Sequence, residues 1–125
     1  MAKRKVTNLT DVSEITCVIQ KGKADDIVQS LLDAGIQGAT VHSGVGTGIR
    51  ERMGLLGVAV EVEREIVQVL VSKDQVDRIF ERMYLAGRLD TPGMGYMYAA
   101  PLVQAATYIP AHLLEDKDSI SSMGM

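Results

Sequence analysis

The chain has 125 residues, of which 46% are hydrophobic and 23% charged, with a formal net charge of −3. This length favours one domain, and the lack of a basic excess argues against a nucleic-acid-binding protein. No apolar run reaches the length of a membrane span, so membrane insertion is not expected. A single cysteine, Cys17, excludes an intramolecular disulfide and favours a reducing, cytoplasmic location.

Residues 1–14 are polar and are interpreted as an N-terminal arm. Residues 15–20 form the first expected strand, and residues 24–34 form an amphipathic helix with its apolar side chains on one stripe. Gly35 follows at the position where a left-handed residue is favoured. A second strand is expected over residues 38–44.

Glycines are frequent from Gly44 to Gly48, where they allow the backbone to approach a ligand closely or simply form a flexible connection. Residues 49–64 are interpreted as a protruding loop, although alternating valines near its end are compatible with an extension of the third strand. The main body of that strand is expected over residues 65–71.

Ser72 and Gln75 have the spacing of a capping box, which predicts the start of a second amphipathic helix that ends near Gly87. The composition of the remaining chain predicts a turn over 90–95, a fourth strand over 96–103, a turn or short strand over 104–110, and a polar C-terminal tail over 111–125.

Strand, helix and terminal glycine recur with an offset of 52 positions, as from Lys21 to Lys73. Ile27 then corresponds to Ile79, and Leu31 to Met83. Two βαβ units in one domain predict an α+β, ferredoxin-like double βαβ sandwich: a four-stranded antiparallel sheet with two helices on one face. The domain is expected over residues 15–110.

The first and third strands carry apolar side chains on both faces, such as Cys17 and Val18, or Val69 and Leu70. Two helices cover only one face of a sheet, and leaving a large aliphatic side chain exposed costs about 1.5–3 kcal/mol relative to burying it. The other face is therefore expected to be buried against further copies of the chain, in a closed homo-oligomer with loops near each subunit boundary.

Two segments, residues 35–41 (GIQGATV) and 69–77 (VLVSKDQVD), resemble the PII nitrogen-regulatory signal-transduction proteins. The resemblance covers about residues 15–101. It implies a trimer whose sheets face inward, which senses a small effector at clefts between subunits. It also implies a protruding loop that docks on a protein partner such as a membrane transporter or a metabolic enzyme.

Carried over to this sequence, the resemblance implies ATP, ADP or AMP as the effector and six binding residues. Thr40 matches a residue near the adenine, Gly46 and Gly48 match the base of the protruding loop, and Arg88, Gly93 and Gly95 match a second, phosphate-facing loop. Clustered backbone N–H groups in such loops are a reasonable anion site.

Several positions depart from that family pattern. Thr91 and Tyr96 stand where PII proteins have lysines around the second loop, and Met94 replaces an acidic residue. The arginines expected beyond the fourth strand are missing, which should weaken ATP binding because each charge-assisted contact contributes about 1.5–3 kcal/mol. The protruding loop has no tyrosine, so nucleotidylation is not expected.

Other features leave alternatives open. Arg64, with Arg50 and Arg52, is placed either against an anionic effector or partner, or on a solvated loop face. His42 has no second metal-type ligand at a recognisable spacing, so no metal is expected, and no set of groups suited to catalysis is recognised. A PII-like regulator is therefore preferred to an enzyme. The alternatives are a structural or interaction trimer that has lost the nucleotide, and a CutA-like metal-binding trimer.

Overall fold

The computed structural model describes residues 6–46 and 62–108. Four strands form an antiparallel sheet in the order β3-β4-β2-β5. Their bounds are Thr40–Gly46 for β3, Val62–Ser72 for β4, Val12–Gln20 for β2 and Gly95–Pro101 for β5. This order is that of the ferredoxin-like split βαβ arrangement. The predicted α+β class with antiparallel strands is confirmed.

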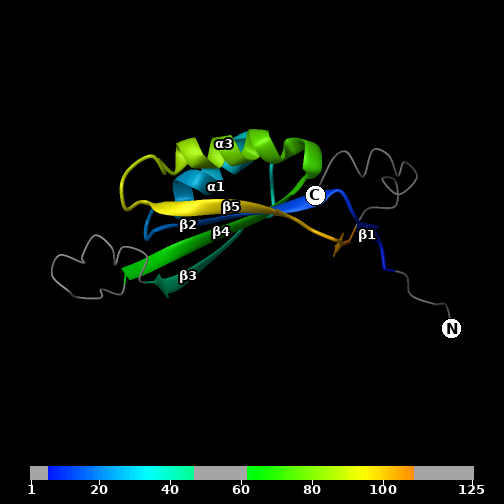
Figure 1. The fold of residues 1–125 in the computed structure, drawn as a ribbon, viewed down its shortest axis with the longest axis horizontal. Coiled ribbons are helices and arrows are strands. Elements are labelled where there is room, and N and C mark those ends of the chain that lie inside the picture. Colours follow the sequence, from blue (N-terminus) through cyan, green and yellow to red (C-terminus); the bar gives the residue numbers. More distant parts are fainter. Residues whose placement is uncertain (1–5, 47–61, 109–125) are drawn as a thin grey trace.

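Two helices, α1 (Ala24–Asp33) and α3 (Val76–Ala86), lie on the same face of this sheet (Figure 1). Their innermost side chains have no solvent exposure: Ile27 and Leu31 on α1, and Ile79 and Met83 on α3. They pack against buried side chains of β2 and β4, namely Ile15, Cys17, Ile19, Val67, Val69 and Val71. Equivalent positions of the two units are therefore buried alike, as the repeat predicts.

The two helices are followed by glycine for different reasons. Gly35 has φ +83°, the left-handed conformation predicted for it. Gly87 has φ −83°, and the left-handed residue is instead Arg88, with φ +53°. A β-carbon on Gly87 would lie 2.9 Å from Cδ1 of Ile19 and 3.1 Å from Cδ1 of Ile27. Close packing, rather than backbone conformation, explains the glycine at position 87.

The predicted capping box at Ser72 is wrong. The Ser72 side chain makes no capping hydrogen bond, and its hydroxyl donates to Oδ1 of Asp74 at 2.6 Å. The hydroxyl thus bonds a side chain two residues on instead of a backbone N–H, and a short 3-10 helix, η2 (Lys73–Gln75), follows Ser72. Helix α3 then begins at Val76.

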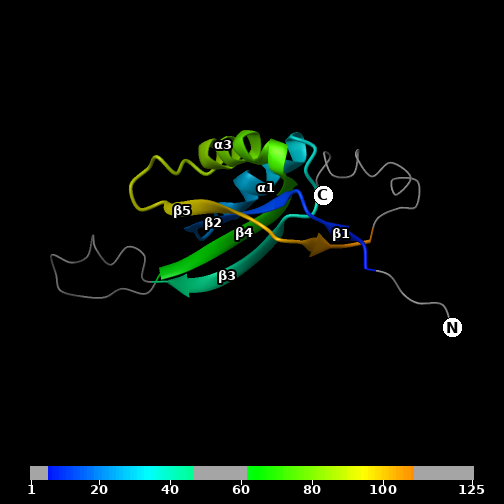
Figure 2. The same ribbon diagram turned by 45° about the vertical axis from the view of Figure 1, so that its right-hand side comes forward.

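Strand β2 begins at Val12, earlier than the predicted start at residue 15. The polar residue Ser13 is only 6% exposed, and it pairs with Val71 on one side and Pro101 on the other. A second, two-stranded sheet pairs β1 (Asn8–Leu9) with β6 (Ala105–Ala106). Part of the predicted N-terminal arm therefore pairs with the short strand predicted within 104–110 (Figure 2). The predicted tail over 111–125 lies outside the described residues.

The predicted protruding loop over 49–64 is too long at its C-terminal end. Residues 62–64 belong to β4 and pair with residues 44–46 of β3, so Gly44 and Gly46 lie in a strand. Glycine can join the ladder because its backbone N–H and C=O groups pair as those of other residues do. The remaining part of the predicted loop lies outside the described residues.

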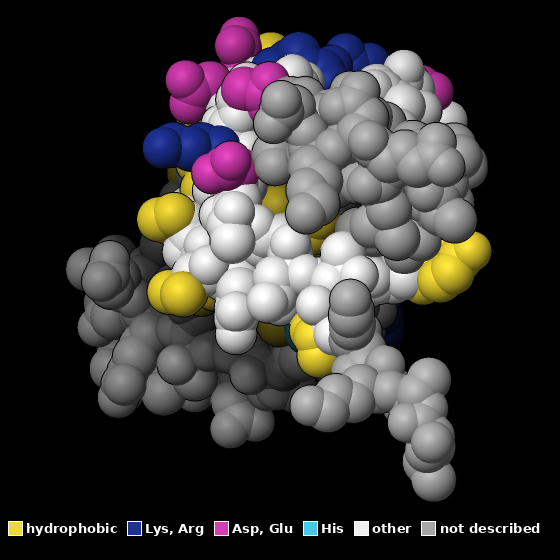
Figure 3. Space-filling view, turned by 90° about the vertical axis from the view of Figure 1, so that its right-hand side faces the viewer, with side chains coloured by type: hydrophobic (Ala, Val, Ile, Leu, Met, Phe, Trp, Pro, Cys, Tyr) yellow, Lys and Arg dark blue, Asp and Glu magenta, His cyan; other side chains and the backbone are white. Residues whose placement is uncertain are grey.

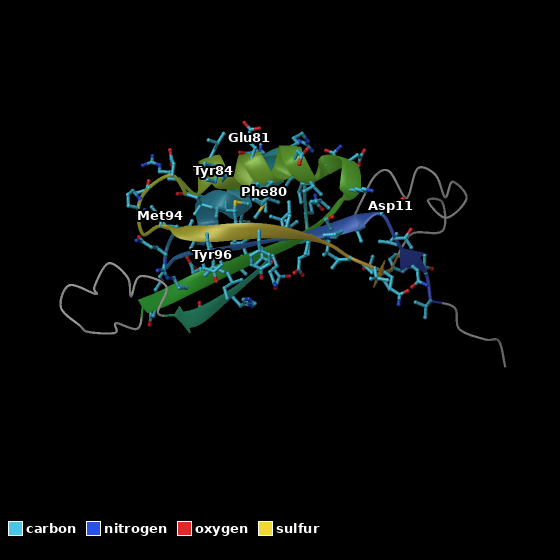
Figure 4. All side chains as sticks on the ribbon, viewed as in Figure 1. Asp11, Phe80, Glu81, Tyr84, Met94 and Tyr96 are labelled. Atoms are coloured by element: carbon cyan, nitrogen blue, oxygen red, sulfur yellow. The ribbon has the colours of Figure 1, made fainter. Side chains whose placement is uncertain are left out.

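The sheet face opposite the helices carries apolar side chains that are half-buried or exposed: Val18, Ile66, Leu70, Tyr96 and Tyr98. Tyr96 is 58% exposed and lies below β5, whereas Phe80 lies between α3 and the sheet (Figure 4). Thr16 and Gln68 share this face, as the strand register requires. The predicted apolar second face is therefore present, with polar positions among the apolar ones.

Charged side chains are concentrated on the helical side of the molecule. Seen from the end that carries β1, acidic and basic groups gather over the helical layer, and most visible hydrophobic side chains lie below them (Figure 3). In the parts of the chain covering residues 6–46 and 62–108, no helix is long and apolar enough to cross a membrane.

Candidate functional site

One end of the sheet gathers residues from three neighbouring strands and the loop that leads into β5. Gly44 of β3 pairs with Arg64 of β4, and Arg64 pairs with Gln20 of β2. The backbone N–H of Gln20 donates to the carbonyl of Met94, in the loop before β5, at 2.9 Å. This loop and the end of β3 at Gly46 therefore lie at the same end of the sheet (Figure 1).

The loop between α3 and β5 is held by two turns and a buried side chain. The N–H of Thr91 donates to the carbonyl of Arg88 at 2.9 Å, and the N–H of Met94 donates to the carbonyl of Thr91 at 3.1 Å. Gly93 has φ +79°. Met94 is 8% exposed and belongs to the hydrophobic core, which explains a methionine where the resemblance implies an acidic residue.

Gly95 is a glycine because β5 passes close to the backbone of β2. It has φ +153°, and a β-carbon there would overlap the carbonyl oxygen of Val18 and lie 2.9 Å from Cα of Ile19. Packing within the chain is therefore sufficient to explain this glycine. Its identity is no evidence of a bound phosphate.

Arg64 occupies a place that the sequence does not reveal. It is only 6% exposed, and its Nη1 lies 3.4 Å from the carbonyl oxygen of Gly93 and 3.3 Å from that of Met94. The predicted solvated loop face is wrong for this side chain, whereas a contact with an effector or partner stays a prediction. The guanidinium instead donates to the loop that the resemblance assigns to phosphate.

The carboxylates nearest to Arg64 in the chain are already engaged. Glu63 forms an exposed ion pair with Lys21, with Oε2 and Nζ 2.6 Å apart. Their mutual hydrogen bond raises the pKa of Lys21 and lowers the pKa of Glu63. Glu65 accepts hydrogen bonds from the N–H groups of Gly22 and Ala24, at the start of α1. This cap compensates for Lys23, which makes no side-chain capping bond.

Arg88 is exposed and has the only non-glycine positive φ among the described residues, +53°. A side chain in this conformation costs about 1–2 kcal/mol. The conformation belongs to the end of α3, where the N–H groups of Arg88 and Leu89 donate to the carbonyls of Leu85 and Tyr84, each at 3.2 Å. The residue precedes the Gly93–Gly95 loop, so its charged side chain is placed on a short, turn-rich segment beside the candidate site.

The remaining predicted residues lie along β3. Thr40 begins the strand opposite Gln68, and Gly46 ends it opposite Val62. At about 3.4 Å per residue, the two are about 20 Å apart. One bound molecule that reaches both must therefore be elongated and lie along β3. Gly48 is outside the described residues.

Two reactive residue types show no sign of chemistry here. Burial raises the pKa of the Cys17 thiol from 9.0 to about 11, so it stays protonated at neutral pH. His42 is exposed on β3. Within the described parts of the chain, no group of three His, Cys, Asp or Glu side chains is placed to hold a metal ion.

Comparison with known proteins gives a consistent family and fold. The family described as nitrogen regulatory protein P-II matches residues 12–109 of this chain. A similar solved structure is the Arabidopsis thaliana PII bound to citrate, with a TM-score of 0.61 and 20% sequence identity, covering 74% of this chain and 78% of that chain. At this identity the likeness concerns the fold. No curated protein matches the sequence. The resemblance predicted from the sequence is confirmed.

Proposed function

Because this chain belongs to the P-II nitrogen regulatory protein family, we propose that it is a signal-transduction regulator rather than an enzyme. It senses an anionic effector at clefts between subunits and controls a protein partner. The observation that carries this proposal is that the end of β3 at Gly46 and the Gly93–Gly95 loop, which Arg64 contacts, lie at the same end of the sheet but at its two opposite edges. At a subunit boundary, the end of β3 from one copy and this loop from the next would bring backbone N–H groups and a buried cation together, which suits an anion.

The subunit clefts require an assembly, and the sheet face opposite the helices supports one. Burying Val18, Ile66 and Leu70 more fully, together with the exposed rings of Tyr96 and Tyr98, would stabilise an association through this face. We propose the homotrimer that the family resemblance implies. The charged helical layer would then face solvent.

The effector proposed is an adenine nucleotide: ATP, ADP or AMP. The separation of Thr40 from Gly46 along β3 supports an elongated ligand, with its base toward Thr40 and its phosphates toward Gly46 and Gly48. Arg88, Gly93 and Gly95 of a neighbouring subunit would face the phosphates. The citrate of the Arabidopsis protein is a different anion, and it serves here as a comparison ligand.

The proposed partner contact involves the segment after β3, whose residues 47–61 lie outside the described part of the chain. A membrane transporter or a metabolic enzyme is the proposed class of partner, reached from the cytoplasm. Coupling an effector to a partner through one segment is a common form of regulation. Co-purification with and without added nucleotide tests this step.

The effector proposal is tested by calorimetric titration with ATP, ADP, AMP and citrate, together with thermal unfolding. A nucleotide at 100 times its dissociation constant stabilises the folded state by about 2.7 kcal/mol. Arg88→Ala should weaken nucleotide binding in this titration, and Arg78→Ala, which removes an exposed arginine on α3, is the matched control. Binding of citrate but of none of the nucleotides would contradict the proposed effector class.

Native mass spectrometry of protein taken from cells tests the assembly and reports any retained small molecule. A trimer with a bound nucleotide is expected. A trimer that shows neither heat nor thermal shift with any of the four ligands would indicate the interaction trimer without an effector. A stable monomer at micromolar concentration would contradict the proposed clefts.

A further inference from the structure

We propose that Arg64 is a positioning residue, which holds the Gly93–Gly95 loop against the end of β2 and supplies the positive charge behind that loop. This inference rests on the proposed effector site and adds to it a residue that the family resemblance does not name. Arg64 lies on β4, whereas the loop leads into β5. Its effect on an effector would be exerted through the loop.

The geometry fixes the loop from two strands. Nη1 of Arg64 approaches the carbonyl oxygens of Gly93 and Met94, at 3.4 and 3.3 Å. Gln20 of β2 contributes its side-chain Nε2, 3.2 Å from the carbonyl oxygen of Gly93, and its backbone N–H, 2.9 Å from that of Met94. Two successive carbonyl groups are thus bound from inside the molecule. The loop can then present other backbone groups outward.

Among the described residues, no carboxylate forms an ion pair with Arg64. Within residues 6–46 and 62–108, the one ion pair closer than 4.0 Å joins Lys21 to Glu63. A guanidinium held by neutral carbonyls keeps its full charge, and burial leaves it less screened by salt than an exposed group. The loop therefore has a positive charge directly behind it, although Thr91 and Tyr96 give it no flanking lysines.

A purely structural role does not require this residue type. Gln20 already donates to both carbonyls, and a buried charge costs more free energy than a neutral donor unless it is fully paired. A neutral residue at position 64 would fill the same buried space at a lower cost in free energy. The cation is explained when the loop it supports faces an anion.

Amide hydrogen exchange tests the positioning role without any ligand. In Arg64→Met, exchange of the Gln20 N–H, which donates to Met94, should accelerate at least about tenfold, because the loop opens locally. The amides of Cys17 and Val69, deep in the central strands, should change by less than about threefold. Arg78→Met is the control for loss of an arginine. Unchanged exchange at Gln20 would overturn the proposal.

Arg64→Lys keeps the charge and a donor, so it should restore much of the protection at Gln20. If Arg64→Met does not fold, Arg64→Lys becomes the test. Exchange at Gln20 that is the same in Arg64→Lys as in wild type would support a charged donor at this position. Protection no better in Arg64→Lys than in a folded Arg64→Met would contradict a role for the charged donor.

Calorimetric titration tests the charge. Relative to wild type, ATP affinity should fall about tenfold in Arg64→Met and recover in Arg64→Lys, while adenosine, which has no phosphate, should bind equally to all three. Equal ATP affinity in wild type and Arg64→Met would overturn the role in the effector site. If wild-type protein binds no nucleotide, the proposed effector fails, and the exchange result at Gln20 still decides whether Arg64 holds the loop.

Discussion

Replacing Gly95 with alanine should destabilise the protein far more than the same change at another left-handed glycine. Gly95 has φ +153°, and its β-carbon would overlap the carbonyl oxygen of Val18 and approach Cα of Ile19 to 2.9 Å. Gly38 has φ +89° but no atom within 4 Å of its β-carbon position. The comparison therefore separates backbone conformation from crowding.

The expected magnitudes follow from what each change disturbs. The positive φ contributes about 1 kcal/mol at either position. At Gly95 the start of β5 must also move away from β2, which weakens its pairing with Ile19 and the hydrogen bond from the Gln20 N–H to Met94, at about 1 kcal/mol each. Partial exposure of Met94 adds about 1 kcal/mol. Gly95→Ala should thus cost about 3–5 kcal/mol, and Gly38→Ala about 1 kcal/mol.

Urea unfolding followed by far-ultraviolet circular dichroism measures both costs, and the chain has no tryptophan to use instead. The m-values of the two variants should agree with wild type, so that midpoints report the free energy of unfolding. If the two variants lose stability equally, the close approach of β5 to β2 is incorrect. Gly95 would then be free to serve a ligand instead.

Three further predictions concern single side chains. Burial raises the pKa of the Cys17 thiol from 9.0 to about 11. The protonated thiol therefore contributes fully to the free energy of unfolding below pH 9, and about 2 kcal/mol is lost as the pH rises through 11. Urea titrations should show this loss in wild type but not in Cys17→Ala. Glu65→Ala should cost about 1–2 kcal/mol in the same assay by uncapping α1, and Glu65→Gln, which keeps an acceptor, should cost less; equal costs would argue against the cap. Arg88→Gly should change the free energy of unfolding by less than about 1 kcal/mol, because glycine adopts the left-handed conformation without strain but is more flexible in the unfolded chain. The same change should weaken ATP binding about tenfold in calorimetry. A large loss of stability with normal ATP affinity would instead make Arg88 structural.

The fold could be predicted from the sequence because the pattern of core residues occurs twice in the chain. Ile27 and Ile79 recur at one helical position of two units, and both are fully buried. Periodicity could not find the first residues of β2, because Ser13 and Glu14 are polar while their backbone pairs on both sides in the middle of the sheet. At such positions, backbone pairing with the neighbouring strands outweighs the low strand propensity of polar residues.

The site was less accessible, because its contacts join positions far apart in the chain. Nothing local to Arg64 marks it as buried, since its neighbours Glu63 and Glu65 are charged and the residues before it suggest a loop. Its place follows from pairing with Gln20 and from the return of the chain at Gly93. The alternation from Val58 to Val62 was the one available signal that the strand began before residue 65.

Judging an anion site by the residues within its loop leads to a particular error in this chain. The Gly93–Gly95 loop lacks flanking lysines, which by itself argues for lost phosphate binding. However, electrostatic attraction depends on distance in space and on screening, and a buried guanidinium is screened less than a lysine in water. Arg64 touches the loop from a strand that precedes it by almost thirty positions, and Arg88 stands before the loop, just after the end of α3. The positive charge is therefore relocated rather than absent, so the substitutions within the loop do not exclude an anionic effector.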